Sequence, residues 1–134
     1  ENLNVCTKDY FQNAISQMVS ECENEQLPVT HFLVFSDDIE WCKNNLNIHN
    51  IPVTFVDWNK GQDSWQDMAL MSKCNHNIIA NSSFSWWGAF LNQNPNKKVF
   101  APSLWNNREL HTKDTYYKYT FADVVPPEWT RINI

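Results

Sequence analysis

Apolar and polar positions alternate along the chain in blocks that predict helices and short strands in turn. The first block has apolar residues at helical spacing and predicts a helix over about residues 9–23, which Pro28 prevents from continuing. Its apolar residues are Tyr10, Phe11, Ala14, Ile15, Met18, Val19 and Cys22. The next block, Phe-Leu-Val-Phe at residues 32–35, is apolar on both faces, as is typical of a buried parallel strand.

The same alternation continues through most of the chain. Further strands are expected at residues 53–56, 77–80 and 98–101, and further helices at about 39–46, 64–74 and 84–92. Beyond residue 102 the chain is rich in Trp and has no regular pattern until about residue 126. Strands separated by helices predict an α/β fold with a Rossmann-like parallel sheet flanked by helices.

Composition narrows the class of protein. Apolar residues make up 43% of the 134 residues and charged residues only 19%, so the chain can build a core and is predicted to form a single domain over residues 1–134. The net charge of -5, with few and scattered basic residues, disfavours binding to nucleic acid. The only glycines, Gly61 and Gly88, leave no room for a P-loop or a GxGxxG nucleotide motif.

The cysteines and histidines do not predict a metal site. The four cysteines, at positions 6, 22, 42 and 74, have no zinc-binding spacing, and two of them fall within apolar-patterned segments. We therefore expect the cysteines to be core residues of a protein in a reducing compartment. His76, which directly precedes a predicted strand, has no further ligands nearby in the sequence and is expected to be a packed or surface residue.

Polar residues follow three of the predicted strands, at the edge where open parallel sheets bind ligands. The segments are 36–38, 57–59 and 81–83. In the third, Asn81-Ser82-Ser83 leads directly into a helix, where backbone N–H groups, hydroxyls and the helix dipole can bind a phosphate. The alternative is an ordinary helix cap. Asp67 could accept hydrogen bonds from a base or a ribose, or could be a solvated acid in the first turn of a helix.

Three segments, taken in order, carry a resemblance to a known family. They are Phe35–Lys43 (FSDDIEWCK), Asp67–Ser72 (DMALMS) and His76–Ala89 (HNIIANSSFSWWGA). Together they resemble the C-terminal, donor-binding half of the alpha-1,2-fucosyltransferases, glycosyltransferase family 11. The resemblance runs from about Tyr10 to Trp129, and the last segment is long and unusual.

The resemblance implies the C-terminal half of a GT-B transferase that acts with inversion and without a metal ion or cofactor. The donor would be GDP-fucose, and the fucose would go to the 2-hydroxyl of a terminal galactose-like residue of an oligosaccharide. By position, Asn81, Ser82, Ser83 and Phe84 would bind the donor nucleotide around its diphosphate, and Asp67 would contact the guanine or the ribose. Asp37 and Asp38 match a family segment near the donor site, although they could equally be acids at a helix start.

The chain also departs from the family pattern. The basic His-x-Arg-Arg segment, expected upstream, is absent, and neither Arg108 nor Arg131 lies in such a motif. We therefore expect a longer parent enzyme and a weak or inactive isolated fragment. The sequence identifies no general base for the acceptor hydroxyl. The alternative is a non-catalytic nucleotide-sugar-binding or interaction module. In a microbe the enzyme is expected in the cytoplasm or at the periphery of a membrane, where the pathway of the glycan acceptor would bring it. In a eukaryote it is expected at the Golgi membrane.

Overall fold

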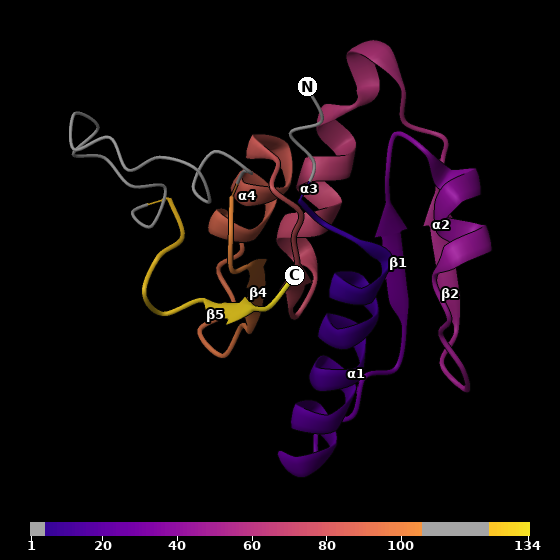
Figure 1. Cartoon of the computed structure of the whole chain (residues 1–134). Helices are drawn as coiled ribbons and strands as arrows, with labels where there is room; N and C mark the ends of the chain where they lie inside the picture. Colours follow the sequence, from indigo (N-terminus) through magenta and orange to yellow (C-terminus); the bar gives the residue numbers. More distant parts are fainter. Residues whose placement is uncertain (1–4, 106–123) are drawn as a thin grey trace, which may run out of the picture.

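Helices and strands alternate along the chain in the order that the sequence predicts (Figure 1). A computed structural model describes residues 5–105 and 124–134. Its helices are α1 (Lys8–Asn24), α2 (Ile39–Asn45), the short 3-10 helix η1 (Gly61–Asp63), α3 (Trp65–Lys73) and α4 (Ser83–Phe90). Its strands are β1 (Phe32–Phe35), β2 (Val53–Val56), β3 (Asn77–Ile78), β4 (Val99–Pro102) and β5 (Thr130–Ile132).

All strand pairs of the described residues are parallel, and helices flank them, which confirms the α/β class. The strands form two hydrogen-bonded sheets, one of β1 and β2 and one in the order β3-β4-β5. Helix α2 packs on β1 and β2, whereas α1 contacts both β3 and β5. The arrangement is consistent with a Rossmann-like architecture, but its strands are divided between two sheets where the sequence predicted one.

Two expectations about the strands need correction. Strand β1 is not buried on both faces: Leu33 is 39% exposed and the other three residues are half-buried, because β1 pairs with β2 alone among the described strands. Strand β5 was not predicted, because three residues of mixed polarity carry almost no periodic signal. It nevertheless pairs with β4, and the N–H of Ser103 donates to the carbonyl of Ile132 beyond the ladder (2.8 Å).

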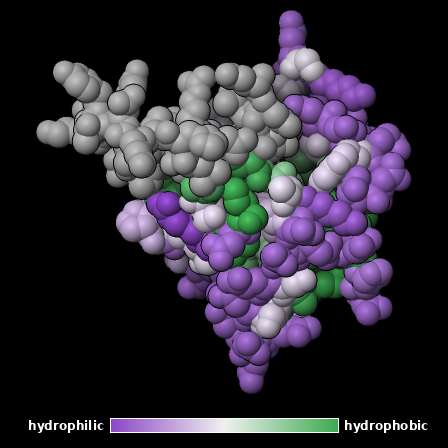
Figure 2. Space-filling model, viewed as in Figure 1, coloured by the Kyte–Doolittle hydropathy of each residue, from purple (hydrophilic) through white to green (hydrophobic). Residues whose placement is uncertain are grey.

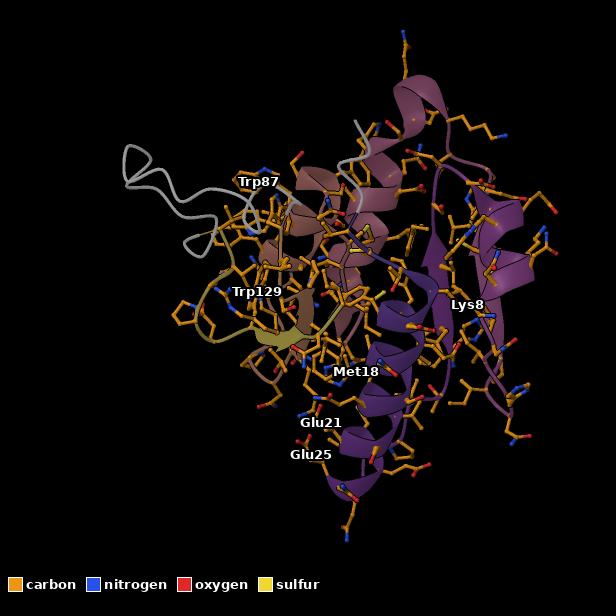
Figure 3. All side chains as sticks on the ribbon, viewed as in Figure 1. Lys8, Met18, Glu21, Glu25, Trp87 and Trp129 are labelled. Carbon is orange, nitrogen blue, oxygen red and sulfur yellow. The ribbon has the colours of Figure 1, made fainter. Side chains whose placement is uncertain are left out.

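Two clusters of buried side chains form the core, whereas most of the described residues on the face in Figure 2 are hydrophilic. The larger cluster gathers residues of α1 with others from β4 and β5: Val5, Cys6, Tyr10, Ala14, Met18, Cys22, Phe100 and Ile132. The second contains Ile79, Ala89, Val99, Ala101, Val125 and Trp129. Figure 3 shows Met18 on the side of α1 that faces β4 and β5. The hydroxyl of Tyr10 donates to the carbonyl of Ile79, so α1 is tied to the chain just after β3.

The cysteines are free thiols, as the sequence predicts. Cys6, Cys22 and Cys42 are buried and Cys74 is half-buried. Burial raises the pKa of Cys6 to about 11, which keeps its thiol protonated near neutral pH. None of the described helices is both long and apolar enough to span a bilayer.

Candidate functional site

Helices α3 and α4 lie side by side and begin at the same end of the molecule. Helix α3 leads into β3 and α4 follows it, so both run against the strand direction. The side-chain amide of Asn92, just after α4, donates to the carbonyl of Cys74, just after α3 (2.7 Å). Because the carboxyl ends of the two helices meet there, their N-terminal turns lie together at the carboxyl end of β3.

Gly88 allows the two helices to approach closely. A Cβ atom added at Gly88 would lie 3.0 Å from the Cβ of Met71 on α3. Asp67 precedes Met71 by four residues and Phe84 precedes Gly88 by four, which is about one helical turn in each case. Asp67 and Phe84 therefore each lie about one turn before this contact, at the N-terminal end of their helix.

The loop that leads into α4 is held by its serines. Ser82 is the N-cap: its Oγ accepts from the N–H of Ser85 (3.4 Å), and the N–H of Trp86 donates to its carbonyl (3.0 Å). The hydroxyl of Ser85 lies within hydrogen-bonding distance of the carbonyls of Ala80 (3.2 Å) and Ser82 (3.0 Å). Ser82 thus has the ordinary capping role that the sequence left open as an alternative.

Ser83 and Phe84 are the exposed residues of this helix start. Both occupy the first turn of α4, and their backbone N–H groups have no hydrogen-bond acceptor within the described part of the chain. Free N–H groups at a helix start, together with the positive end of the helix dipole, favour an anion. The assignment of these two residues to a diphosphate remains a prediction that the geometry permits.

Asn81 has a different environment. Its side-chain amide donates to the carbonyl of Trp105 (3.0 Å), which joins the loop after β3 to the segment after β4. Its backbone is also hydrogen-bonded to the thiol of Cys6. These contacts shape the loop, and the predicted binding of the donor nucleotide by Asn81 remains untested.

Asp67 is held by a residue that the sequence analysis did not single out. The side-chain amide of Asn59 donates to its Oδ1 (2.8 Å), and both side chains are half-buried. Asn59 lies three residues after β2, within a segment identified only as one of the polar strand ends. The sequence therefore showed that Asn59 follows a strand, but it did not show that Asn59 binds Asp67.

Asp37 and Asp38 lie at the end of β1. Asp38 caps α2: its Oδ1 accepts from the N–H of Trp41 (3.0 Å), and its own N–H donates to Ser36 (2.9 Å). Asp37 is exposed. No hydrogen bond or ion pair between described residues connects either aspartate to Asp67 or to the start of α4. Asp38 therefore has the helix-start role that the sequence left open.

The tryptophan pair of α4 divides between core and surface. Trp86 stacks on Phe90, with ring centroids 4.9 Å apart, and its indole N–H donates to the carbonyl of Val124 (2.8 Å). Trp87, which is labelled in Figure 3, is 47% exposed. Its ring meets that of Trp86 edge-on. The two tryptophans have different surroundings because adjacent helix positions point about 100° apart.

Polar residues tie together the ends of α3 and α4 away from the candidate site. Asn92 is buried and also donates to the side chain of Asn77 (2.8 Å), which in turn donates to the carbonyl of Met71 (2.8 Å). The ammonium of Lys97 donates to the carbonyls of Ala89 (2.8 Å) and Asn92 (2.9 Å) at the end of α4. These bonds fix how the two helices sit against each other.

Ionisable groups of the described residues show no metal-binding arrangement of three or more His, Cys, Asp or Glu. His76 is half-buried, and its Nδ1 accepts from the backbone N–H of Lys98 (2.9 Å). Burial, and then the charge of Lys98, lower the pKa of His76, while Glu25 acts in the opposite direction. His76 is therefore a packed neutral residue near neutral pH, as expected.

Comparison with known proteins assigns a family. The profile described as Glycosyl transferase family 11 matches residues 2–132. The O-antigen biosynthesis glycosyltransferase WbnK of Escherichia coli is 40% identical over 116 residues, which cover 84% of this chain and 36% of that protein. An alpha-1,2-colitosyltransferase of Escherichia coli is 37% identical over 131 residues, 96% of this chain and 40% of that protein.

The similarity extends to a human protein over a shorter region. Galactoside alpha-(1,2)-fucosyltransferase 1 of Homo sapiens is 38% identical over 60 residues, 45% of this chain and 16% of that protein. The chain spans only about two fifths of the length of the bacterial relatives. No solved structure matches it. The profile match over nearly the whole chain, supported by these relatives, shows that the chain belongs to glycosyltransferase family 11.

Proposed function

We propose that this chain is the donor-binding part of an alpha-1,2-fucosyltransferase of the GT-B type. The enzyme would transfer fucose from GDP-fucose to the 2-hydroxyl of a terminal galactose-like acceptor, with inversion and without a metal ion. The observation that carries the proposal is the close pairing of α3 and α4, because the first turn of α3 contains Asp67 and the first turn of α4 contains Ser83 and Phe84. Two relatives, the alpha-1,2-colitosyltransferase and the galactoside alpha-(1,2)-fucosyltransferase, support an alpha-1,2 linkage and a deoxy-sugar donor.

The leaving group of this reaction is a nucleoside diphosphate, whose developing charge must be neutralised. The N–H groups of Ser83 and Phe84, the hydroxyl of Ser83 and the dipole of α4 are suited to that task. Helix α3 begins close by and adds a second positive helix end. Backbone donors of this kind are fixed in place before the reaction, so little reorganisation is needed as the glycosidic bond breaks.

The carboxylate of Asp67 would bind the nucleoside part of the donor, through its base or its ribose. A carboxylate accepts hydrogen bonds only, so it suits the N–H groups of a base or the hydroxyls of a ribose. Acceptor binding and the catalytic base are assigned to the rest of a longer enzyme, and the chain alone is expected to bind donor with little turnover. The alternative function is a module that binds a nucleotide sugar without catalysis.

Calorimetric titration of the chain with GDP and with UDP tests the proposal, after circular dichroism has shown that the sample is folded. Selective binding of GDP is expected. Asp67→Ala should lower the GDP-to-UDP affinity ratio. Asp9→Ala, which removes an exposed acid from the first turn of another helix, should leave the ratio unchanged. A folded chain that binds neither nucleotide would contradict the donor-binding role.

A further inference from the structure

We infer that Asn59 is a positioning residue that determines the base specificity of the donor site by fixing the orientation of the Asp67 carboxylate toward guanine. The inference rests on the proposed function. It goes further by giving Asn59 a role in that site.

The geometry separates this contact from ordinary helix capping. Asp67 stands at the third position of α3, where an acid often reaches back to the N–H of the N-cap residue. Here the N–H of the N-cap, Ser64, donates instead to the carbonyl of Gly61 (3.2 Å), and the side chain of Ser64 makes no capping bond. The carboxylate of Asp67 is instead bound across the loop by Asn59 (2.8 Å).

The bond leaves acceptor capacity on Asp67. Asn59 occupies one lone pair of Oδ1, and no described residue donates to Oδ2. A carboxylate has about four acceptor positions, so its two oxygens can still receive two parallel N–H groups. Because the amide of Asn59 comes from the loop after β2, outside α3, its hydrogen bond limits rotation of the carboxylate and so restricts the plane in which those N–H groups can lie.

Guanine has the matching chemistry. Its N1–H and 2-amino group are neighbouring donors, and a fixed carboxylate can accept both at once. Hypoxanthine keeps N1–H but lacks the amino group, and uracil places carbonyl oxygens on both sides of its single N–H, where they would face the carboxylate. A carboxylate that rotates freely would distinguish these bases less well, because it loses the bidentate geometry.

The test compares GDP with inosine diphosphate, which differs only by the 2-amino group. The wild-type chain should prefer GDP by about tenfold, the value of one hydrogen bond to a charged group. Asn59→Ala should reduce that preference to about twofold or less. Asn45→Ala is the matched control, because it also removes one hydrogen bond donated by a side-chain amide. That bond, to the carbonyl of Trp41, is 2.8 Å long and lies on α2, away from α3.

A second variant of nearly equal size gives a readout that a purely structural residue would not change. Asn59→Asp places two carboxylates in contact, and such a pair retains a shared proton to a higher pH. When protonated, residue 59 can again donate to Asp67. Affinity of this variant for GDP should therefore rise as the pH is lowered from about 8 to about 5, while the wild type shows no such rise.

The outcomes separate the inference from the proposed function. A folded wild-type chain that binds neither GDP nor inosine diphosphate would contradict both. A wild-type chain that prefers GDP, with Asn59→Ala retaining the preference and Asn59→Asp following the wild-type pH profile, would overturn the role of Asn59 alone. Loss of the preference in Asn59→Ala, together with recovery of Asn59→Asp at low pH, would support it.

Discussion

Substitution of Gly88 by alanine tests whether the candidate site depends on close contact between α3 and α4. The new methyl group would meet the Cβ and Cε of Met71 at 3.0 Å and its Sδ at 3.3 Å. Carbon atoms in favourable contact are about 3.5–4.0 Å apart, so the helices must separate by about 0.5–1 Å. The flexible end of Met71 can rotate away, but its Cβ is fixed to the backbone of α3 and cannot.

Two opposing effects set the magnitude. Alanine favours a helix over glycine by about 1 kcal/mol, whereas overpacking of a core costs about 1–3 kcal/mol. We expect Gly88→Ala to lower the free energy of unfolding by about 1 kcal/mol, or the melting temperature by about 4 °C. It should also weaken GDP binding, because the separation of the helices moves Asp67 away from the start of α4.

Urea unfolding followed by circular dichroism measures the effect. Ser16→Ala, at an exposed interior position of α1, is the control for helix propensity and should raise the midpoint slightly. In a background of Met71→Ala, which removes Sδ and Cε, the cost of Gly88→Ala should fall by about 1 kcal/mol or less. A gain in stability for Gly88→Ala equal to that of the control would refute the close contact.

Three further predictions follow from the same structure. Ser82→Ala should lower the free energy of unfolding by about 1 kcal/mol through loss of the cap of α4. Ser83→Ala should instead weaken GDP binding without changing the melting temperature, and thermal scans with and without GDP measure both effects. Asn92→Ala should lower the free energy of unfolding in urea by about 2–3 kcal/mol, because it removes three side-chain hydrogen bonds at a buried residue, two donated by its amide and one accepted from the N–H of Asn94. Because the pKa of His76 is lowered in the folded state, the protein should lose stability as the pH falls below about 6.5, and His76→Asn should reduce that loss in urea midpoints measured between about pH 7 and pH 5.

Local pattern predicted the elements far better than their assembly. The runs at 32–35 and 53–56 became β1 and β2 with the same boundaries, since four consecutive residues with a high preference for strands leave few alternatives. Helix α1 extends one residue beyond the prediction at each end. The division into two sheets was not predictable, because strand pairing depends on contacts distant in sequence that no local period encodes.

The candidate site shows the same limit. The sequence identified Asp67 and the serines at the start of α4, because a strand end and a helix start can be recognised locally. It could not identify Asn59, whose importance arises from one hydrogen bond across eight residues and a 3-10 turn. Nor could it show that Gly88 is needed where α3 and α4 approach, since a lone glycine in a helical segment has several explanations.

The bonds that join α3 and α4 at their carboxyl ends have a consequence for motion. Asn77, Asn92 and Lys97 hold that end, while the N-terminal turns carry free N–H groups and exposed side chains. Amide hydrogen exchange should therefore be slow near the joined end and progressively faster toward the first turns. The two helices would therefore be held together at their carboxyl ends, while a bound nucleotide could draw their N-terminal turns closer without disturbing the core.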